Sequence, residues 1–173
     1  KASLEIEGPV YIRLEREDTL LLTKTNIEYR IGDSIKLRDG TDATIFAIGG
    51  MVSIAMKAAE ILSSENIQVQ VISMVSIKPL DASVIRAAAR QTGAIVVAED
   101  HNIYGGLSSA IAELLLIEEQ FSSLEIIAIH DTFAESGEPN DLRKKYHLEA
   151  EDIANATRNA ILKKEKRRFI YRA

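Results

Sequence analysis

Four short strand-like runs recur along the chain, and stretches with helical spacing separate them. The runs are Ala43–Ile48, Val69–Met74, Ala94–Ala98 and Leu124–Ile129. A largely unbroken apolar run is typical of a strand that is covered on both faces. After the first run, apolar residues from Val52 to Leu62 recur at the spacing of one helix face. Strands that alternate with helices form crossover units, so the pattern predicts an α/β fold with a mostly parallel sheet.

Turn and capping residues mark the ends of these elements. Ser34–Leu37 is a further strand candidate, and the Asp39-Gly40 pair that follows is a strong turn signal. Asp81 is placed as the N-cap of a helix. Two more helices are predicted at Pro139–Tyr146 and Ile153–Ile161.

The pair Gly49-Gly50 ends the first apolar run and precedes a helix, a place where a nucleotide phosphate can bind. The sequence there is Gly-Gly-Met-Val-Ser. It contains neither the Gly-x-Gly-x-x-Gly pattern of dinucleotide sites nor the Gly-Lys-Ser/Thr of a P-loop. The pattern therefore favours a tight structural turn over a nucleotide site.

Residues 1–30 do not follow the pattern of the rest. Val10–Leu14 alternates like a short strand, whereas Thr19–Arg30 shows no period. A lone strand cannot bury itself. We therefore expect residues 1–30 to be the end of one domain and a linker, and residues 31–173 to form a second domain.

Composition excludes several classes of function. The chain of 173 residues has no cysteine, which excludes disulfides and thiol chemistry, and its net charge of −5 disfavours a nucleic-acid surface. No stretch is long and apolar enough to span a bilayer, and no signal peptide is visible. We expect a cytoplasmic protein with no membrane or nucleic-acid partner. The basic cluster from Lys163 to Arg172 is interpreted as a helix end.

Polar residues gather after the run Ala94–Ala98. Glu99, Asp100 and His101 predict a turn that leads to Gly105-Gly106 and a helix from Leu107. A carboxylate beside an imidazole is a candidate for acid–base chemistry or metal binding. His130 and Asp131 end the next strand candidate and could lie nearby, whereas His147 is interpreted as a surface residue. We favour a structural or interface role for this cluster over direct catalysis.

Five landmarks occur in order along the chain. They are Gly8–Leu14, Asp42–Gly50, Lys78-Pro79-Leu80-Asp81, Glu99 with Gly105-Gly106, and Asp131-x-Phe133 with Ser136-Gly137 and Leu142. Together they resemble the end of the pyrimidine-binding domain and the C-terminal domain of thiamine-diphosphate enzymes of the transketolase family. The resemblance implies a three-layer α/β/α domain with a five-stranded, mostly parallel sheet and one short antiparallel edge strand.

The resemblance also implies a function. Enzymes of this family transfer a two-carbon ketol unit between sugar phosphates, with thiamine diphosphate and Mg²⁺ as cofactors. The family's metal–diphosphate motif, Gly-Asp-Gly followed by Asn, is not in this chain, and its activating glutamate lies upstream of Gly8. The chain resembles the C-terminal subunit of a split transketolase, which implies a role in dimerisation and assembly, no cofactor in this fragment, and no activity without an N-terminal domain or subunit.

Related enzymes remain as alternatives. 1-Deoxy-D-xylulose-5-phosphate synthase and the β subunit of 2-oxoacid dehydrogenase E1 share the layout. The synthase usually has Tyr-Pro-Arg-Gly where this chain has Leu14-Glu15-Arg16-Glu17, which favours transketolase. An alternative of another class is a non-catalytic interaction module.

The resemblance implies one ligand residue and one interface. Arg16 matches an arginine that binds the substrate phosphate, and no catalytic or metal-binding residue is expected in this fragment. The implied homodimer contact lies at Glu99, His101, Ile103, Tyr104, Gly105, Gly106 and Leu107.

Overall fold

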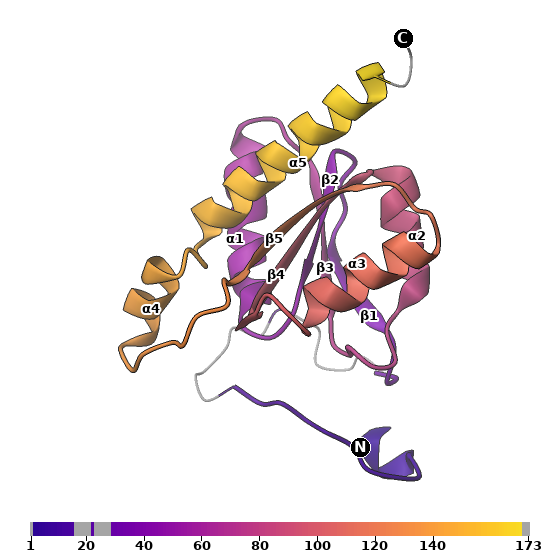
Figure 1. Ribbon diagram of the computed structural model, residues 1–173, viewed down its shortest axis with the longest axis vertical. Coiled ribbons are helices and arrows are strands. Elements are labelled where there is room, and N and C mark those ends of the chain that lie inside the picture. The colour runs from indigo at the N-terminus through magenta and orange to yellow at the C-terminus, as the bar shows by residue number, and fades with distance from the viewer. Residues whose placement is uncertain (1, 16–21, 23–28, 171–173) are drawn as a thin grey trace.

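The computed structural model describes residues 2–15, 22 and 29–170, of which 168–170 are described by their backbone alone. Figure 1 shows the arrangement of the elements. A short 3₁₀ helix, η1 (Ala2–Glu5), comes first. The strands are β1 (Ser34–Arg38), β2 (Ala43–Ala47), β3 (Val69–Met74), β4 (Ala94–Asn102) and β5 (Ser123–Ile129). The helices are α1 (Met51–Ser64), α2 (Ala82–Gln91), α3 (Leu107–Ile117), α4 (Pro139–Lys145) and α5 (Ala150–Ile170).

The strands form one five-stranded sheet in the order β1-β3-β2-β4-β5. The pairs β2–β3, β2–β4 and β4–β5 are parallel, and β1 is an antiparallel edge strand on β3. The predicted fold class is therefore confirmed, including the short antiparallel edge. No helix in the described part of the chain is long and apolar enough to cross a bilayer.

Two helical layers cover the two faces of the sheet (Figure 1). Helices α1 and α5 pack on one face, and α2 and α3 pack on the other. Successive side chains of a strand point to opposite faces, so Ile45 of β2 enters the core below α1 and α5 while Phe46 enters the core below α2 and α3. Both side chains are fully buried, as the unbroken apolar run predicts.

The Asp39-Gly40 turn joins two strands that are not neighbours. The chain leaves β1 and crosses the start of β3 before it enters β2, and the Thr41 and Asp42 amides both donate to the carbonyl of Gln68. A Cβ on Gly40 would lie 2.6 Å from the Cα of Val69. Only glycine permits this close approach.

Asp81 caps helix α2 as predicted, and it also fixes the edge strand. Its carboxylate accepts the backbone N–H of Val84 at 3.3 Å, and the N–H and hydroxyl of Ser34 at 3.1 and 2.7 Å. Partial burial acts to raise the pKa of Asp81, but hydrogen bonds from Ser83, Ser34 and Val84 outweigh it and hold that pKa below its ordinary value.

Two predictions about local structure are wrong. The turn expected at Glu99–His101 does not exist, because β4 continues to Asn102, which pairs with Ile129 after an irregularity in the β4–β5 register. The strand expected at Val10–Leu14 is not formed either. These residues have no strand to pair with in the described part of the chain, and they lie outside the layered body (Figure 1).

Candidate functional site

The carboxyl ends of β4 and β5 hold a connected set of polar groups. Carboxyl ends of parallel strands meet at one edge of a sheet, where ligands and partners commonly bind. Asn102 donates through Nδ2 to Asp131 Oδ1 at 3.1 Å, and its Oδ1 accepts the N–H of Tyr104 at 2.9 Å. The N–H of Ile103 also donates to the carbonyl of Ile129 at 2.9 Å. These bonds fix the chain that leads from β4 to α3 against the end of β5.

Glu99 is buried below this edge and caps α3 from a distance. Its side chain is 1% exposed. Its two carboxylate oxygens accept the backbone N–H groups of Leu107 at 2.7 Å and Ser108 at 2.9 Å. The first N–H groups of a helix have no partner within the helix, and an anion there is stabilised by the helix dipole. In the landmark formed by Glu99 and the glycine pair, Glu99 therefore has a structural role, which is to cap α3.

The predicted interface residues lie together, but they differ in accessibility. His101, Gly105 and Tyr104 are exposed, with Tyr104 at 68%, and Ile103 is half-buried. Glu99, Gly106 and Leu107 are buried within the chain's own fold. These buried residues therefore support the segment from inside the fold. A partner would contact only the exposed residues. An interface role for the segment stays a prediction.

The consecutive residues Glu99, Asp100 and His101 do not assemble an acid–base group. All three belong to β4, and each side chain has a different partner. Glu99 points to α3, Asp100 pairs with Arg13, and His101 Nδ1 lies 2.8 Å from the carbonyl oxygen of Asn102. His147, as predicted, is a surface residue, 3.6 Å from a carboxylate oxygen of Asp152.

The described residues also provide no metal centre. Among residues 2–15, 22 and 29–170, no three His, Cys, Asp or Glu side chains converge as they would around a metal ion.

The segment before the domain contacts the same edge of the sheet. Arg13 donates to Asp100 Oδ1 at 3.0 Å and to the Asp100 carbonyl at 3.3 Å. Glu15 accepts the backbone N–H of Gly50 at the start of α1. No sequence signal predicts these contacts, because they join residues 35 and 87 positions apart. Arg16, the predicted phosphate ligand, lies outside the described residues.

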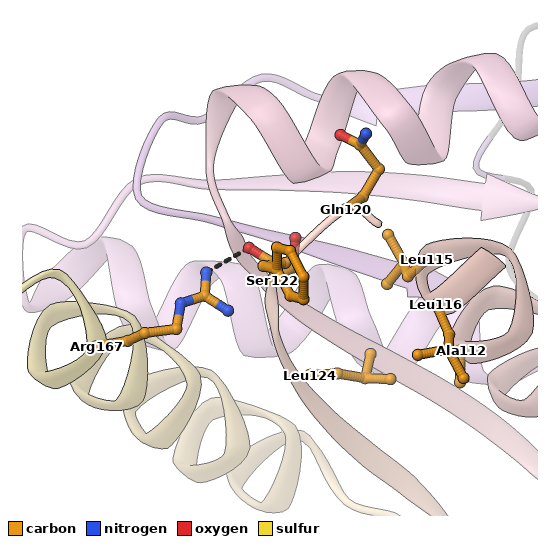
Figure 2. Close-up of a pocket in the computed structure, with 8 residues that line it drawn as sticks. Ala112, Leu115, Leu116, Gln120, Ser122, Leu124 and Arg167 are labelled. Carbon is orange, nitrogen blue, oxygen red and sulfur yellow. Dashed lines mark hydrogen bonds between the residues drawn. The ribbon is translucent and has the colours of Figure 1, made fainter. Parts of the chain in front are cut away.

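A shallow apolar depression lies at the opposite end of the domain, between the end of α3 and α5 (Figure 2). Leu116 and Phe121 at its rim are 79% and 77% exposed. Arg167 is the one charged residue in its lining, and it donates to the carbonyl oxygen of Phe121. Ser122 supplies the one hydroxyl among the residues that line the depression, and none of them is a His, Asp or Glu that could activate it, so the depression is best described as a packing surface.

These features define a three-layer α/β domain whose polar residues at the carboxyl edge cap a helix and present a surface. Residues 32–153 match the family model described as the transketolase C-terminal domain. The chain belongs to the transketolase C-terminal domain family.

Three relatives illustrate the match. The chain is 39% identical to a 6-deoxy-6-sulfo-D-fructose transketolase subunit of Clostridium sp. (strain MSTE9), over 87% of this chain and 46% of that protein. It is 39% identical to 1-deoxy-D-xylulose-5-phosphate synthase of Heliobacterium modesticaldum, over 91% of this chain and 25% of that enzyme. A solved structure of a split-gene transketolase, an inactive β4 tetramer, superposes with a TM-score of 0.87 at 41% identity, over 91% of this chain and 52% of that one. The chain thus spans about half of the subunits it matches, or a quarter of the synthase.

Proposed function

We propose that this chain is the C-terminal part of a transketolase, which transfers a two-carbon ketol unit between sugar phosphates. The observation that carries the proposal is the likeness to a split-gene transketolase, at 41% identity over 91% of this chain. In this proposal the C-terminal domain holds the assembly together, and the segment before it supplies one substrate contact. The reacting centre belongs to the rest of the enzyme.

Thiamine diphosphate and Mg²⁺ are assigned to an N-terminal domain or subunit. The family's metal–diphosphate motif, Gly-Asp-Gly followed by Asn, does not occur in the sequence, which supports this division. When bound there, the cofactor supplies the carbanion chemistry of ketol transfer. Residues 1–30 are proposed to complete the pyrimidine-binding domain, and residues 31–173 are proposed to form the C-terminal domain. The family match begins at residue 32, which supports this boundary.

Two roles are proposed for residues of this chain. Arg16 binds the phosphate of the sugar phosphate, since a guanidinium can donate two parallel hydrogen bonds to phosphate oxygens. The surface at Tyr104 and His101 pairs two copies in a homodimer. Exposure of the Tyr104 side chain at 68%, beside the exposed Gly105, supports a contact surface there. A cytoplasmic location is also inferred, and cell fractionation tests it.

The test is reconstitution of the reaction. The natural protein is assayed for ketol transfer between sugar phosphates, alone and with its N-terminal partner, in the presence of thiamine diphosphate and Mg²⁺. We expect activity only when the diphosphate-binding part is present. Micromolar binding of thiamine diphosphate by this chain alone, measured by calorimetry, would contradict the division of roles.

The alternative enzyme is 1-deoxy-D-xylulose-5-phosphate synthase, favoured by 39% identity over 91% of this chain. The two reactions differ in product, because the synthase is named for forming 1-deoxy-D-xylulose 5-phosphate. Assaying formation of that compound in the same reconstituted mixture, beside ketol transfer between sugar phosphates, therefore separates them. Assembly without either activity would favour the non-catalytic interaction module.

A further inference from the structure

The chain enters the domain through a stretch that polar contacts fasten to the loop after β3. The hydroxyl oxygens of Tyr29 and Ser76 lie 2.6 Å apart in a hydrogen bond, and Ser76 Oγ also accepts the backbone N–H of Gly32 at 3.1 Å. At the end of the same loop, Asp81 accepts the N–H and the hydroxyl of Ser34. Side chains of one loop therefore hold the stretch just before and at the start of β1.

The stretch itself contributes little to the core. β1 is an edge strand that pairs on one side only, with β3, and the register of that pairing shifts between Lys36 and Arg38. None of residues 29–38 is buried, and Leu37 is the one that packs against either hydrophobic core. In contrast, every residue of β2 is buried. Residues 29–38 are therefore held mainly by hydrogen bonds at the edge of the domain.

The chain is attached to the body separately on each side of this stretch. Downstream, the N–H groups of Thr41 and Asp42 donate to the carbonyl of Gln68 at 3.0 and 2.9 Å, and the Asp42 carboxylate accepts the N–H of Gln68 at 2.6 Å. Ala43, which follows, is fully buried. Upstream, Leu22 packs against the core below α1 and α5. The stretch can therefore come loose without releasing β2.

We propose that residues 29–38 act as a strap, which opens as one unit while β2, β3, β4 and β5 stay folded. Elements with few buried apolar contacts open locally at a lower free energy than the core. Opening uncovers the edge of β3 and frees a stretch that can extend about 33 Å, at about 3.3 Å per residue. The chain before residue 29 gains this slack, so its contacts with the body, such as that of Arg13 with Asp100, can detach and reattach without unfolding of the domain. The strap goes beyond the proposed function and does not depend on it.

Hydrogen exchange by mass spectrometry in the complete natural protein tests whether the strap is a separate unit. We expect peptides from residues 29–38 to exchange at least about tenfold faster than peptides from β2 and β4. The difference should shrink as urea approaches the unfolding transition, because global unfolding then governs exchange in both. Equal exchange without urea would mean that the strap opens only with the whole domain, and would overturn the proposal.

Two variants test whether the strap opens as one unit. Tyr29→Phe and Ser76→Ala remove hydrogen bonds at its start, and each should raise exchange about threefold or more in peptides that reach Leu37, at its far end. Tyr11→Phe is the matched control, since Tyr11 is 89% exposed, and it should change nothing. A rise confined to the residues beside the lost bond, or an equal rise in β4, would contradict opening as one unit.

A reversible lock provides an independent test. Ile35 and Ser73 are paired across β1 and β3, where antiparallel partners have Cα atoms about 4.5–5.5 Å apart, a separation that suits a disulfide. This chain has no cysteine, so Ile35→Cys with Ser73→Cys introduces its one possible disulfide, and mass spectrometry shows when it has formed.

Limited trypsin digestion then compares the oxidised and reduced forms of this double variant. Cleavage is followed after Lys36, an exposed residue of the strap, and after Lys57, an exposed residue of α1 that serves as the control. Because proteolysis follows the population of the open form, cleavage after Lys36 should be at least about tenfold slower in the oxidised form, with cleavage after Lys57 unchanged. Equal cleavage after Lys36 in the two forms would overturn the strap.

Discussion

Gly106 lies directly against the buried carboxyl group of Glu99, so closely that a Cβ on residue 106 would lie 2.8 Å from Glu99 Cδ. The backbone of Gly106, with φ −97° and ψ −154°, is one that any residue can adopt. Glycine is therefore required by the carboxylate and not by the backbone. The carboxylate cannot move away easily, because Leu107 and Ser108 both donate to it.

This relationship predicts coupled effects on stability. Gly106→Ala should lower the free energy of unfolding by about 1–3 kcal/mol, because the added methyl group overpacks a buried site. Glu99→Ala should also destabilise, since two buried N–H groups lose their acceptor. The double variant should be less destabilised than the sum of the two, because removing the carboxylate relieves the clash. Urea denaturation measures all three, with Glu113→Gln on the exposed face of α3 as the control. Strict additivity would show that the two residues are not coupled.

A second prediction concerns pH and Asp81. Its pKa is lowered in the folded chain by hydrogen bonds from Ser83, Ser34 and Val84, although burial opposes the shift. A lowered folded pKa means that the ionised group stabilises the fold above its unfolded pKa, and that this stabilisation is lost as pH falls through the folded pKa. Asp81→Asn should thus lower the free energy of unfolding by about 1 kcal/mol at pH 7, and the deficit should shrink as the pH falls below about 3.9, the ordinary pKa of an aspartate, and through the lower folded pKa.

Urea denaturation at pH 7, and again at a pH below the ordinary aspartate pKa of about 3.9, measures the effect of Asp81→Asn. Asp141→Asn, at an exposed position in α4, controls for the change in net charge. A deficit of the same size at both pH values would mean that the ionised carboxylate has no special role.

Periodicity and capping predicted most of the fold, because both are local. Val69–Met74 was expected as a strand and is β3 with the same bounds, and Asp81 caps α2 as expected. The position of β1 beside β3 was not derivable from the Asp39-Gly40 turn, because a turn residue does not say which strand the chain pairs with next. That placement came only from the family resemblance.

The site was predicted less completely, because it depends on contacts between distant residues. Glu99 to His101 look like a polar turn, yet β4 continues through them to Asn102, which pairs with Ile129 of β5, and the Glu99 side chain is buried against α3. An acidic residue several positions before a glycine pair and a helix is the one signal that could have indicated a remote helix cap. The strand expected at Val10–Leu14 is missing, because an alternating pattern needs a partner strand to form a sheet.

A third prediction concerns Arg16 in the complete enzyme. Arg16→Ala should weaken the binding of phosphorylated substrates by about 1.5–3 kcal/mol, since a charge-assisted contact is lost. KM for unphosphorylated analogues should change little. Steady-state kinetics with both substrate types measures the difference, and Arg16→Lys, which keeps the charge but loses the bidentate geometry, should lie between. A uniform rise in KM for both types would remove Arg16 from the phosphate site.

The last prediction concerns self-association through the surface at Tyr104. We expect the protein to pair two copies at the carboxyl edge of the sheet, because Tyr104 is 68% exposed and interface cores are enriched in tyrosine. Tyr104→Asp should place a charge in the contact and shift the protein toward monomer in sedimentation equilibrium. Phe121 provides a matched control, since it is an aromatic residue 77% exposed at the opposite end of the domain. Phe121→Asp should leave dimerisation unchanged, and circular dichroism should show that both variants fold. A wild-type monomer at tens of micromolar would contradict self-association. Equal effects of the two substitutions would place the contact elsewhere, because a contact at the carboxyl edge predicts that only Tyr104→Asp disrupts pairing.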